Sequence, residues 1–336
     1  MLSRKTHTFS LLASLPLFIY NNTRSFTMDR LVDELLDRLR RLDYQARTIS
    51  IEHLHLLQKQ IEEQRSQNLL DSQFFHERLA WVRFQIPEGL PKAKSMIVVA
   101  VPRPQTRAVF TWNGVRRPLI LPPTYTAYKG IAEQVQSLLA RTLSEKGYTV
   151  TGTALPLKLL AARSGLCQYG RNNICYVSGM GSFLQLVAVY SDMPCEEDSW
   201  QEATMLQVCE ECELCRRACP TGAIPSDRFL LRAELCISYH NEKKGNVPFP
   251  SWMDASWHNC LEGCMRCQRA CPLNKQFLDW VGEEEEFSEE ETALLLDGAS
   301  RDRLSEETAR KLVRLDILDD VGILPRNLGV FFKKQG

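Results

Sequence analysis

Cys209-Glu-Glu-Cys212-Glu-Leu-Cys215-Arg-Arg-Ala-Cys219-Pro220 is the stretch that decides the fold of this chain. Its spacing is C-x2-C-x2-C-x3-C-P, closed by a Cys-Pro pair. A second run, Cys260-x3-Cys264-x2-Cys267-x3-Cys271-Pro272, follows downstream. Runs of this kind hold [4Fe–4S] clusters, in which each of the four irons takes one thiolate. The two runs therefore predict two clusters.

The spacing also predicts which thiolates share a cluster. Three closely spaced cysteines on a tight turn can direct their sulfurs into one pocket, while the cysteine before proline reaches the other cluster. The expected ligands of the first cluster are Cys209, Cys212, Cys215 and Cys271. Those of the second are Cys219, Cys264 and Cys267, with either Cys260 or Cys236 as the fourth.

Two other roles are compatible with closely spaced cysteines. Nine of the twelve cysteines lie within Cys209–Cys271, eight of them in two metal-type runs, which disfavours a disulfide framework. Tetrahedral zinc is the better alternative because CxxC pairs also suit it, but zinc sites usually show paired CxxC units. The remaining cysteines, Cys167, Cys175 and Cys195, are most simply interpreted as buried inert thiols.

The composition is that of an ordinary globular protein, with 44% apolar and 24% charged residues and a formal net charge of zero. The charge is uneven, because residues 1–130 carry 19 Lys and Arg against 11 Asp and Glu. This excess leaves room for a polyanionic partner such as RNA, although ordinary solvated faces explain it equally well. Since thiolate ligands require a reducing compartment, we expect a cytoplasmic protein.

We expect four parts in this chain. Residues 1–27 are predicted to be a dispensable leader or a wrongly assigned start, because their apolar run is too short to span a bilayer and Met28 opens an amphipathic helix. Residues 28–200 are predicted to form an α/β domain, 201–280 a bacterial-ferredoxin-like two-cluster domain, and 281–336 an acidic helical tail. The fold class is therefore α+β, without a membrane span.

Hydrophobic periodicity predicts the elements of these parts. The expected helices are 28–42, 52–66, 70–84, 125–147, 155–164, 288–296 and 304–317. The expected strands are 48–51, 96–101, 149–151 and 183–190. Residues 102–124 are rich in proline and are predicted to be a long loop, of the kind that often serves as a lid or binding loop. The acidic run 282–291 is interpreted as a solvated face or, alternatively, as a docking site for a redox partner.

Glycine-rich turns between Gly165 and Ser182 are the candidate cofactor site, because such turns at the ends of strands and helices often bind ligands. The chain has no P-loop, and Gly179 and Gly181 lack the third glycine of a dinucleotide fingerprint. The candidate cofactor-binding residues are Tyr169, Arg171, Asn172 and Ser182. The alternative is that these residues only cap a helix and complete turns.

Several motifs occur in a characteristic order. They are Ala161-Ala-Arg-Ser-Gly165-Leu-Cys-Gln-Tyr-Gly170-Arg-Asn-Asn, Gly181-Ser-Phe-Leu-Gln-Leu-Val-Ala, the first cysteine run with Pro220-Thr-Gly-Ala-Ile, Cys236-Ile-Ser-Tyr, and Gly263-Cys-Met-Arg-Cys-Gln-Arg-Ala-Cys-Pro-Leu-Asn274. Together they resemble epoxyqueuosine reductases and the related cores of reductive dehalogenases, over about residues 95–280. The chain looks like a divergent member of this group of double [4Fe–4S] cluster proteins.

The resemblance implies an α/β domain that holds cobalamin beside two [4Fe–4S] clusters, which deliver electrons one at a time. It also implies a low-potential electron donor of the ferredoxin or flavodoxin type, and a modified base in tRNA as the substrate of epoxyqueuosine reductases. The spare cluster ligand of the family matches Cys236, so the resemblance favours Cys236 over Cys260.

One departure from the family is informative. Epoxyqueuosine reductases resembling this chain place an acidic residue just before the Ala-x-x-Gly-Leu helix, whereas Thr151-Gly-Thr-Ala-Leu-Pro156 holds no carboxylate. General acid catalysis needs a donor of suitable pKa, which threonine is not. We therefore expect an iron–sulfur reductase with a different substrate. The alternative is an electron-transfer or corrinoid-activating protein that has clusters but no substrate of its own.

Overall fold

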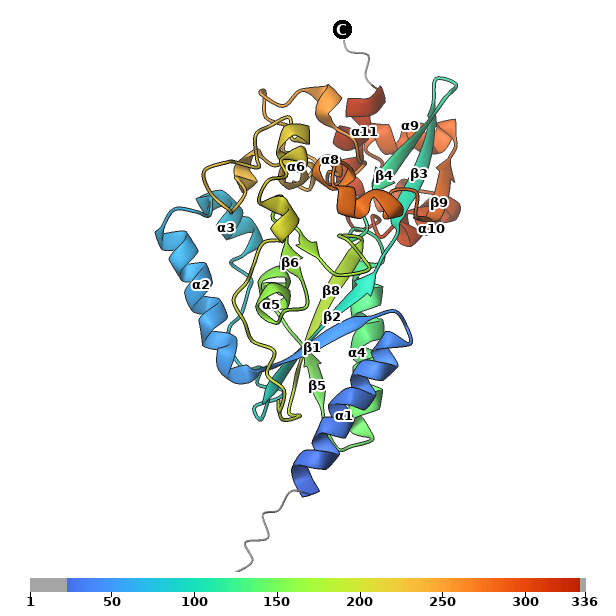
Figure 1. The fold of residues 1–336 in the computed structure, drawn as a ribbon. Helices are drawn as coiled ribbons and strands as arrows, with labels where there is room; N and C mark the ends of the chain where they lie inside the picture. The colour runs from blue at the N-terminus through green and yellow to red at the C-terminus, as the bar shows by residue number, and fades with distance from the viewer. Residues whose placement is uncertain (1–22, 333–336) are drawn as a thin grey trace, which may run out of the picture.

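A four-stranded antiparallel sheet forms the centre of the N-terminal half in the computed structural model, which describes residues 23–332 (Figure 1). Its strand order is β1-β2-β8-β5. The strands are β1 (Gln45–Ser50), β2 (Ser95–Pro102), β8 (Leu184–Ser191) and β5 (Val150–Gly152). The predicted strands are confirmed. Strands β2 and β8 are buried along nearly their whole length, as expected for continuous apolar runs covered on both faces.

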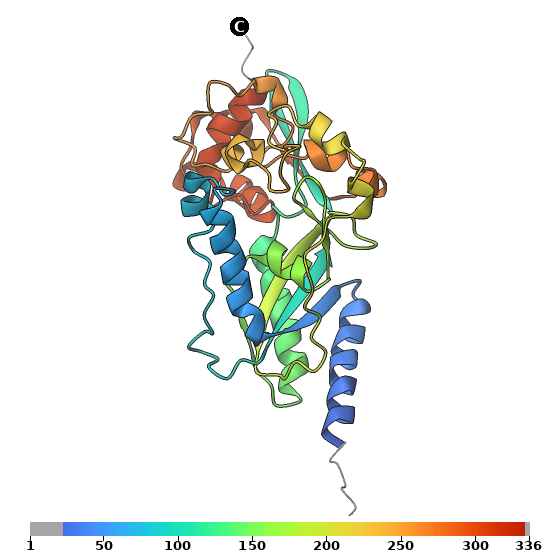
Figure 2. The same ribbon diagram turned by 60° about the vertical axis from the view of Figure 1, so that its left-hand side comes forward.

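Helices cover both faces of this sheet (Figures 1 and 2). Helices α1 (Thr23–Arg40) and α4 (Tyr128–Ser144) share a core with Ile97 and Val99 of β2. Helices α2 (Leu54–Ser66) and α5 (Leu157–Arg163) share a core with Val98 and Ala100 on the other face. Alternate residues of one strand thus face opposite layers. A shorter helix, α3 (Ser72–Arg78), follows α2.

The predicted helices of this half are confirmed, with shifted ends. Helix α1 begins at Thr23, ahead of the expected start at Met28, and α3 is shorter than the expected 70–84. Residues 1–22 of the predicted leader lie outside the described residues, as do residues 333–336. Gly147 has a φ of 82° just after α4, which is the left-handed conformation expected of a residue that ends a helix.

The prediction of a long loop over residues 102–124 is wrong. Strands β3 (Gln105–Trp112) and β4 (Val115–Leu121) form an antiparallel hairpin instead. Its two-residue turn is Asn113-Gly114, with φ of 50° and 71°. An Asn-Gly pair between β-branched and aromatic residues is a strong hairpin signal, and here it outweighs the prolines, which lie at strand ends or on the outer strand β4.

The acidic run forms a strand, β9 (Val281–Phe287), which pairs in parallel with β3 and gives the sheet order β4-β3-β9. Arg107 of β3 approaches Glu284 at 2.7 Å, and Arg116 of β4 pairs with Glu286. Glutamates are poor strand formers, and their like charges repel one another along the strand. The ion pairs with the hairpin reduce this repulsion. The local sequence indicates only a charged surface, so the strand could not be predicted from it.

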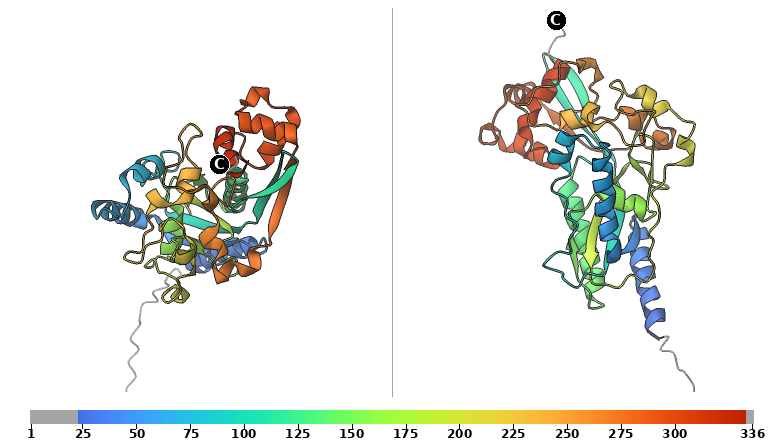
Figure 3. Two further views of the ribbon diagram at one scale, coloured as in Figure 1. Left: turned by 90° about the horizontal axis from the view of Figure 1, so that it is seen from above. Right: turned by 90° about the vertical axis from the view of Figure 1, so that its left-hand side faces the viewer.

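The tail packs on this second sheet (Figure 3). Its helices are α9 (Glu289–Asp297), α10 (Glu306–Arg314) and α11 (Leu324–Phe332), which confirms the two helices predicted there. Phe110 of β3 stacks on Phe287 of β9 with ring centroids 4.6 Å apart, inside a core that the tail helices complete. Across residues 23–332, no helix has the length and apolar character needed to cross a bilayer.

Candidate iron–sulfur centre

Two short helices carry the cysteine runs: α6 (Leu214–Ala218) and α8 (Arg266–Arg269). They contact each other above the central sheet (Figure 1). Cys219 follows α6 with φ −84° and ψ 108°, and Cys271 follows α8 with φ −79° and ψ 123°. A residue before proline is forced toward this extended conformation. The Cys-Pro pairs thus end both helices and turn the fourth cysteine of each run away from the helix axis.

The thiols of Cys209 and Cys215 have environments that include Cys212 and Cys271, which are expected at the same cluster. Burial raises the pKa of the Cys209 thiol, and the nearby thiols of Cys271 and Cys212 raise it further. Burial raises the pKa of Cys215 to about 11, with added contributions from Cys209, Cys212 and Cys271. Such mutual effects require short distances. These contributions agree with a first cluster that Cys271 of the second run shares with three cysteines of the first, and the ligand assignment stays a prediction.

A second group of thiols contains Cys219, Cys236, Cys264 and Cys267. Burial raises the pKa of Cys236 to about 11, and Cys264 and Cys219 add to the shift. Burial also raises the pKa of Cys267, followed by contributions from Cys264 and Cys236 and then from Cys215 of the first group. The two groups are thus neighbours, and each contains one cysteine of the other run.

Cys260 has a different environment. Its side chain is fully buried in a small apolar cluster with Phe183 and Met265, and its Sγ donates to Asn259 Oδ1 at 3.1 Å. Burial raises its pKa, and Cys264 is the thiol that contributes next. Cys236 directly precedes α7 (Ile237–Asn241). Two thiols expected at the second cluster, Cys264 and Cys219, contribute to its raised pKa. These environments favour Cys236 over Cys260, and the identity of the fourth ligand stays a prediction.

The three cysteines that precede the first run are Cys167, Cys175 and Cys195. Cys167 and Cys175 are buried at a two-stranded hairpin, β6 (Gln168–Tyr169) and β7 (Cys175–Tyr176), and the Cys175 thiol lies 3.6 Å from the carbonyl oxygen of Lys158. Cys195 is partly buried, and its thiol lies 3.5 Å from the Glu197 carbonyl oxygen.

The hairpin β6–β7 carries three of the four predicted cofactor-binding residues. Tyr169 is buried, with its ring edge-on to Phe229. The Asn172 side chain donates to the Tyr176 hydroxyl at 3.0 Å and accepts from the Ile174 N–H at 3.3 Å, which closes the turn. Arg171 reaches out of the turn and donates to main-chain carbonyls of the first cysteine run. The side chains of Arg171 and Asn172 therefore already form hydrogen bonds within the protein.

Ser182, the fourth predicted residue, belongs to a buried network that joins the two halves of the molecule. Its N–H donates to Asn274 Oδ1 at 2.9 Å, and its hydroxyl donates to Gln268 Oε1 at 2.8 Å. Asn274 Nδ2 donates to the Ser182 hydroxyl at 2.8 Å and to the Gln268 carbonyl at 2.9 Å. Sequence reasoning missed the role of Asn274 and Gln268, although both lie within the motif that ends at Asn274.

We expect Asn274→Asp to destabilise the folded chain by several kcal/mol, on the order of 3, because a buried carboxylate would replace two donated hydrogen bonds. The denaturation midpoint in urea, followed by tryptophan fluorescence, measures the effect. Asn246 is exposed in the loop after α7, so Asn246→Asp is the matched control. Its free energy of unfolding should stay within about 0.5 kcal/mol of that of the unmodified chain. Equal midpoints for the two variants would contradict a structural role for Asn274.

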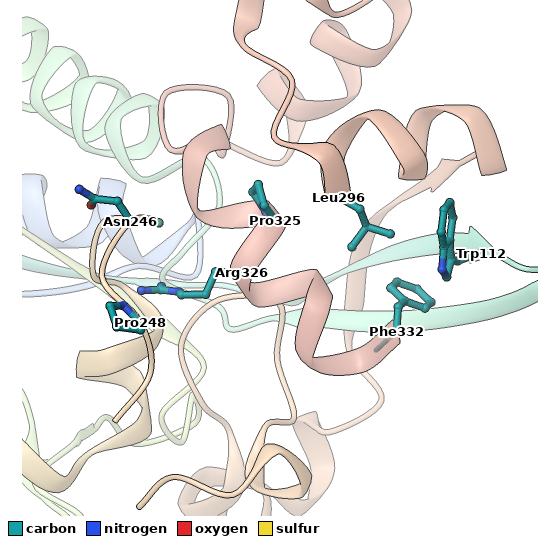
Figure 4. Close-up of a pocket in the computed structure, with 8 residues that line it drawn as sticks. Trp112, Asn246, Pro248, Leu296, Pro325, Arg326 and Phe332 are labelled. Atoms are coloured by element: carbon teal, nitrogen blue, oxygen red, sulfur yellow. The ribbon is translucent and has the colours of Figure 1, made fainter. Parts of the chain in front are cut away.

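A pocket of about 530 Å³ lies away from the cysteines, between the tip of the β3–β4 hairpin and the tail (Figure 4). Trp112 and Phe332 lie at one end, and Arg326 extends beside Pro248 at the other. The Arg326 guanidinium is held by the carbonyls of Asn241, Lys244 and Val247. Arg326 therefore attaches the tail to the loop after α7.

Comparison with protein families assigns the region that contains both cysteine runs. Residues 208–274 match the family described as a 4Fe-4S double cluster binding domain. This part of the chain is a double [4Fe–4S] cluster domain. The zinc and disulfide alternatives are thereby set aside for the two runs.

The chain is also similar to epoxyqueuosine reductases over a longer region. It is 29% identical to the enzyme of Bacillus subtilis over 196 residues, which are 55% of this chain and 49% of that protein. It is 29% identical to the enzyme of Staphylococcus aureus over 211 residues, or 60% and 53% of the two chains. The chain thus spans about half the length of these curated relatives.

Solved structures of epoxyqueuosine reductases share the fold. A selenomethionine-labelled reductase superposes with a TM-score of 0.63 at 21% identity, covering 90% of this chain and 81% of the other. A reductase from Bacillus subtilis gives 0.59 at 21% identity, with 92% and 87% covered. A reductase bound to an epoxyqueuosine-modified tRNA stem loop gives 0.56 at 23% identity, with 74% and 67% covered. At these identities the likeness establishes the fold.

Proposed function

We propose that this protein is an iron–sulfur reductase related to epoxyqueuosine reductases, with a substrate other than the epoxide of epoxyqueuosine. The observation that carries the proposal is the match of residues 208–274 to a double [4Fe–4S] cluster domain within that fold. The proposed ligands of the first cluster are Cys209, Cys212, Cys215 and Cys271. The proposed ligands of the second are Cys219, Cys236, Cys264 and Cys267.

The bound clusters supply one-electron transfer, and the chain's own residues determine how they are held. Burial raises the pKa of most of these thiols, so the cluster-free chain keeps them protonated near neutral pH, and metal binding must release the protons. Asn259 donates from Nδ2 to Cys264 Sγ at 3.2 Å, a contact that favours the thiolate. The contact between α6 and α8 keeps the two thiol groups adjacent, as sequential electron transfer requires.

The absence of an acid at α5 argues against epoxide reduction. Helix α5 begins at Leu157 after Pro156, and its first turn contains no acidic residue. The preceding segment, Thr151–Pro156, contains none either. One reductase structure from Bacillus subtilis shows an aspartate catalytic loop swung out of its active site. Opening an epoxide requires protonation of its oxygen, so we propose that this chain acts on a substrate that needs no acid from this segment.

The residues predicted to bind cobalamin do not fit that role well in this structure. Tyr169, Asn172 and Ser182 are buried, and their turns lie against the protein. A Cβ on Gly181 would approach Asn274 Oδ1 to 2.5 Å, so the cluster domain already occupies that side of the turn. The closed turns favour a second candidate function, an electron-transfer or corrinoid-activating protein without a substrate of its own.

The proposed partners follow from the same relatives. One relative was solved with a modified tRNA stem loop, and residues 1–130 of this chain carry a positive excess, so we propose tRNA as a partner to test. A corrinoid partner belongs to the second candidate function. The proposed electron donor is a low-potential ferredoxin or flavodoxin.

The test uses the full chain reconstituted without oxygen and reduced by dithionite. We expect no conversion of an epoxyqueuosine-containing tRNA stem loop, while a Bacillus subtilis reductase in parallel converts it. Turnover by this chain would contradict the proposal about the substrate. Co-elution of added cobalamin would favour the reductase over the electron-transfer protein, whereas a chain that holds both clusters but no cobalamin would favour the latter.

A further inference from the structure

We propose that Arg171, which sequence reasoning assigned to a cofactor in the α/β domain, instead clamps the first cysteine loop around its cluster and raises the reduction potential of that cluster. The inference rests on the cluster part of the proposed function and is independent of the substrate. It assigns Arg171 as a positioning residue for the electron-transfer centre.

The contacts of Arg171 converge on one loop. Its Nε donates to the carbonyl oxygens of Cys209 at 3.1 Å and Cys212 at 3.0 Å. Its Nη2 donates to the Glu210 carbonyl at 3.0 Å and also to that of Cys209. One guanidinium therefore holds the carbonyls of three residues within the loop that carries three of the four first-cluster thiols. A planar fork with several donors suits this task, and lysine has no equivalent geometry.

The position of Arg171 is itself fixed by the hairpin that carries it. The Gly170 N–H donates to the Ile174 carbonyl at 2.8 Å, and the Asn172 side chain closes the turn on the other side of Arg171. A Cβ on Gly170 would lie 2.6 Å from Asn172 Oδ1, so the turn has no room to rearrange. The β6–β7 hairpin thus presents Arg171 as a rigid arm from the α/β domain to the cluster domain.

The charge of Arg171 should matter as much as its hydrogen bonds. Carbonyl oxygens carry no net charge, so these bonds leave the positive charge of the guanidinium beside the cluster loop. Reduction adds a negative charge to a cluster, and hydrogen bonds and nearby cations stabilise the reduced form.

The test compares redox titrations of reconstituted variants, followed by the EPR signal of the reduced clusters. In Arg171→Gln, we expect the ratio of reduced to oxidised first cluster at a fixed potential to fall at least tenfold, which is 59 mV for one electron. The second cluster should keep its potential. Arg171→Lys keeps the charge and should recover at least half of the shift.

Arg217→Gln is the matched control, because it removes a positive charge within the first cysteine run itself, at a side chain that is 76% exposed. It should shift neither cluster appreciably. Loss of about four irons from Arg171→Gln, with full loading of the control, would support the clamp. Full iron content with both potentials unchanged in Arg171→Gln would overturn the proposal, as would a Lys variant that recovers none of the shift. Iron content of the unmodified chain tests the clusters separately.

Discussion

Replacing Cys236 by alanine is expected to lower the iron content of the reconstituted chain from about eight to about four per chain, whereas Cys260→Ala should leave about eight. Cys236 is the proposed fourth ligand beside Cys219, Cys264 and Cys267, so its removal should leave the second cluster with three ligands. Cys260 lies in an apolar cluster and donates to Asn259. Iron and acid-labile sulfide per chain, with the absorbance of the clusters, measure the difference.

Two further variants serve as controls for the iron content. Cys212→Ala should also lose about four irons, but from the first cluster, so the double variant with Cys236→Ala should hold almost none. Cys195→Ala removes a thiol outside both runs, which contacts the Glu197 carbonyl oxygen, and should lose none. Cys260→Ala with half of the iron, beside a fully loaded Cys236→Ala, would reverse the assignment of the fourth ligand.

The cysteine runs could be read from the sequence because cluster binding imposes ligand spacing over a few residues. The local spacing of Cys209, Cys212 and Cys215 needs no knowledge of the rest of the fold. The choice between Cys236 and Cys260 did require knowledge of the rest of the fold. Both lie near the second run in the sequence, and their environments differ only once α7 and the apolar cluster around Phe183 are placed.

Other features depended on contacts between distant residues and could not be predicted from local patterns. Strand β9 is stabilised by pairing with β3, about 175 residues earlier, and by ion pairs such as Arg107–Glu284. A run of glutamates does not indicate a strand without that partner. The hairpin itself was predictable, since Asn113-Gly114 is a local signal, but the surrounding prolines were given too much weight.

The predicted cofactor residues illustrate the same limit. The glycine-rich turns between Gly165 and Ser182 were predicted to bind a cofactor. The sequence could not show that the neighbour of Gly181 is Asn274 or that the acceptors of Arg171 are carbonyls of the first cysteine run. In this chain the turns contact the cluster domain, so they link the α/β domain to the clusters.

Gly245→Ala is expected to destabilise the chain by about 3 kcal/mol, because the new methyl group has no space. Gly245 lies in the loop after α7, against the turn that precedes α11. A Cβ there would lie 1.7 Å from the carbonyl oxygen of Gly322 and 2.6 Å from its carbonyl carbon. Both contacts are with the main chain, so no side-chain rotation can relieve them. The midpoint of urea denaturation should fall accordingly.

Gly322→Ala is the matched control, because it adds the same methyl group on the other side of the same contact. A Cβ on Gly322 meets no atom within 4 Å, so the free energy of unfolding of Gly322→Ala should change by less than about 1 kcal/mol. The loop and the tail are also joined by Asn327, whose Nδ2 donates to the carbonyls of Asn241 at 3.1 Å and Leu261 at 2.9 Å. Separation of the tail in Gly245→Ala should therefore also loosen the loop between Cys236 and Cys264 and lower iron retention during denaturation. Equal midpoints for the two glycine variants would show that the tail does not lie against this loop.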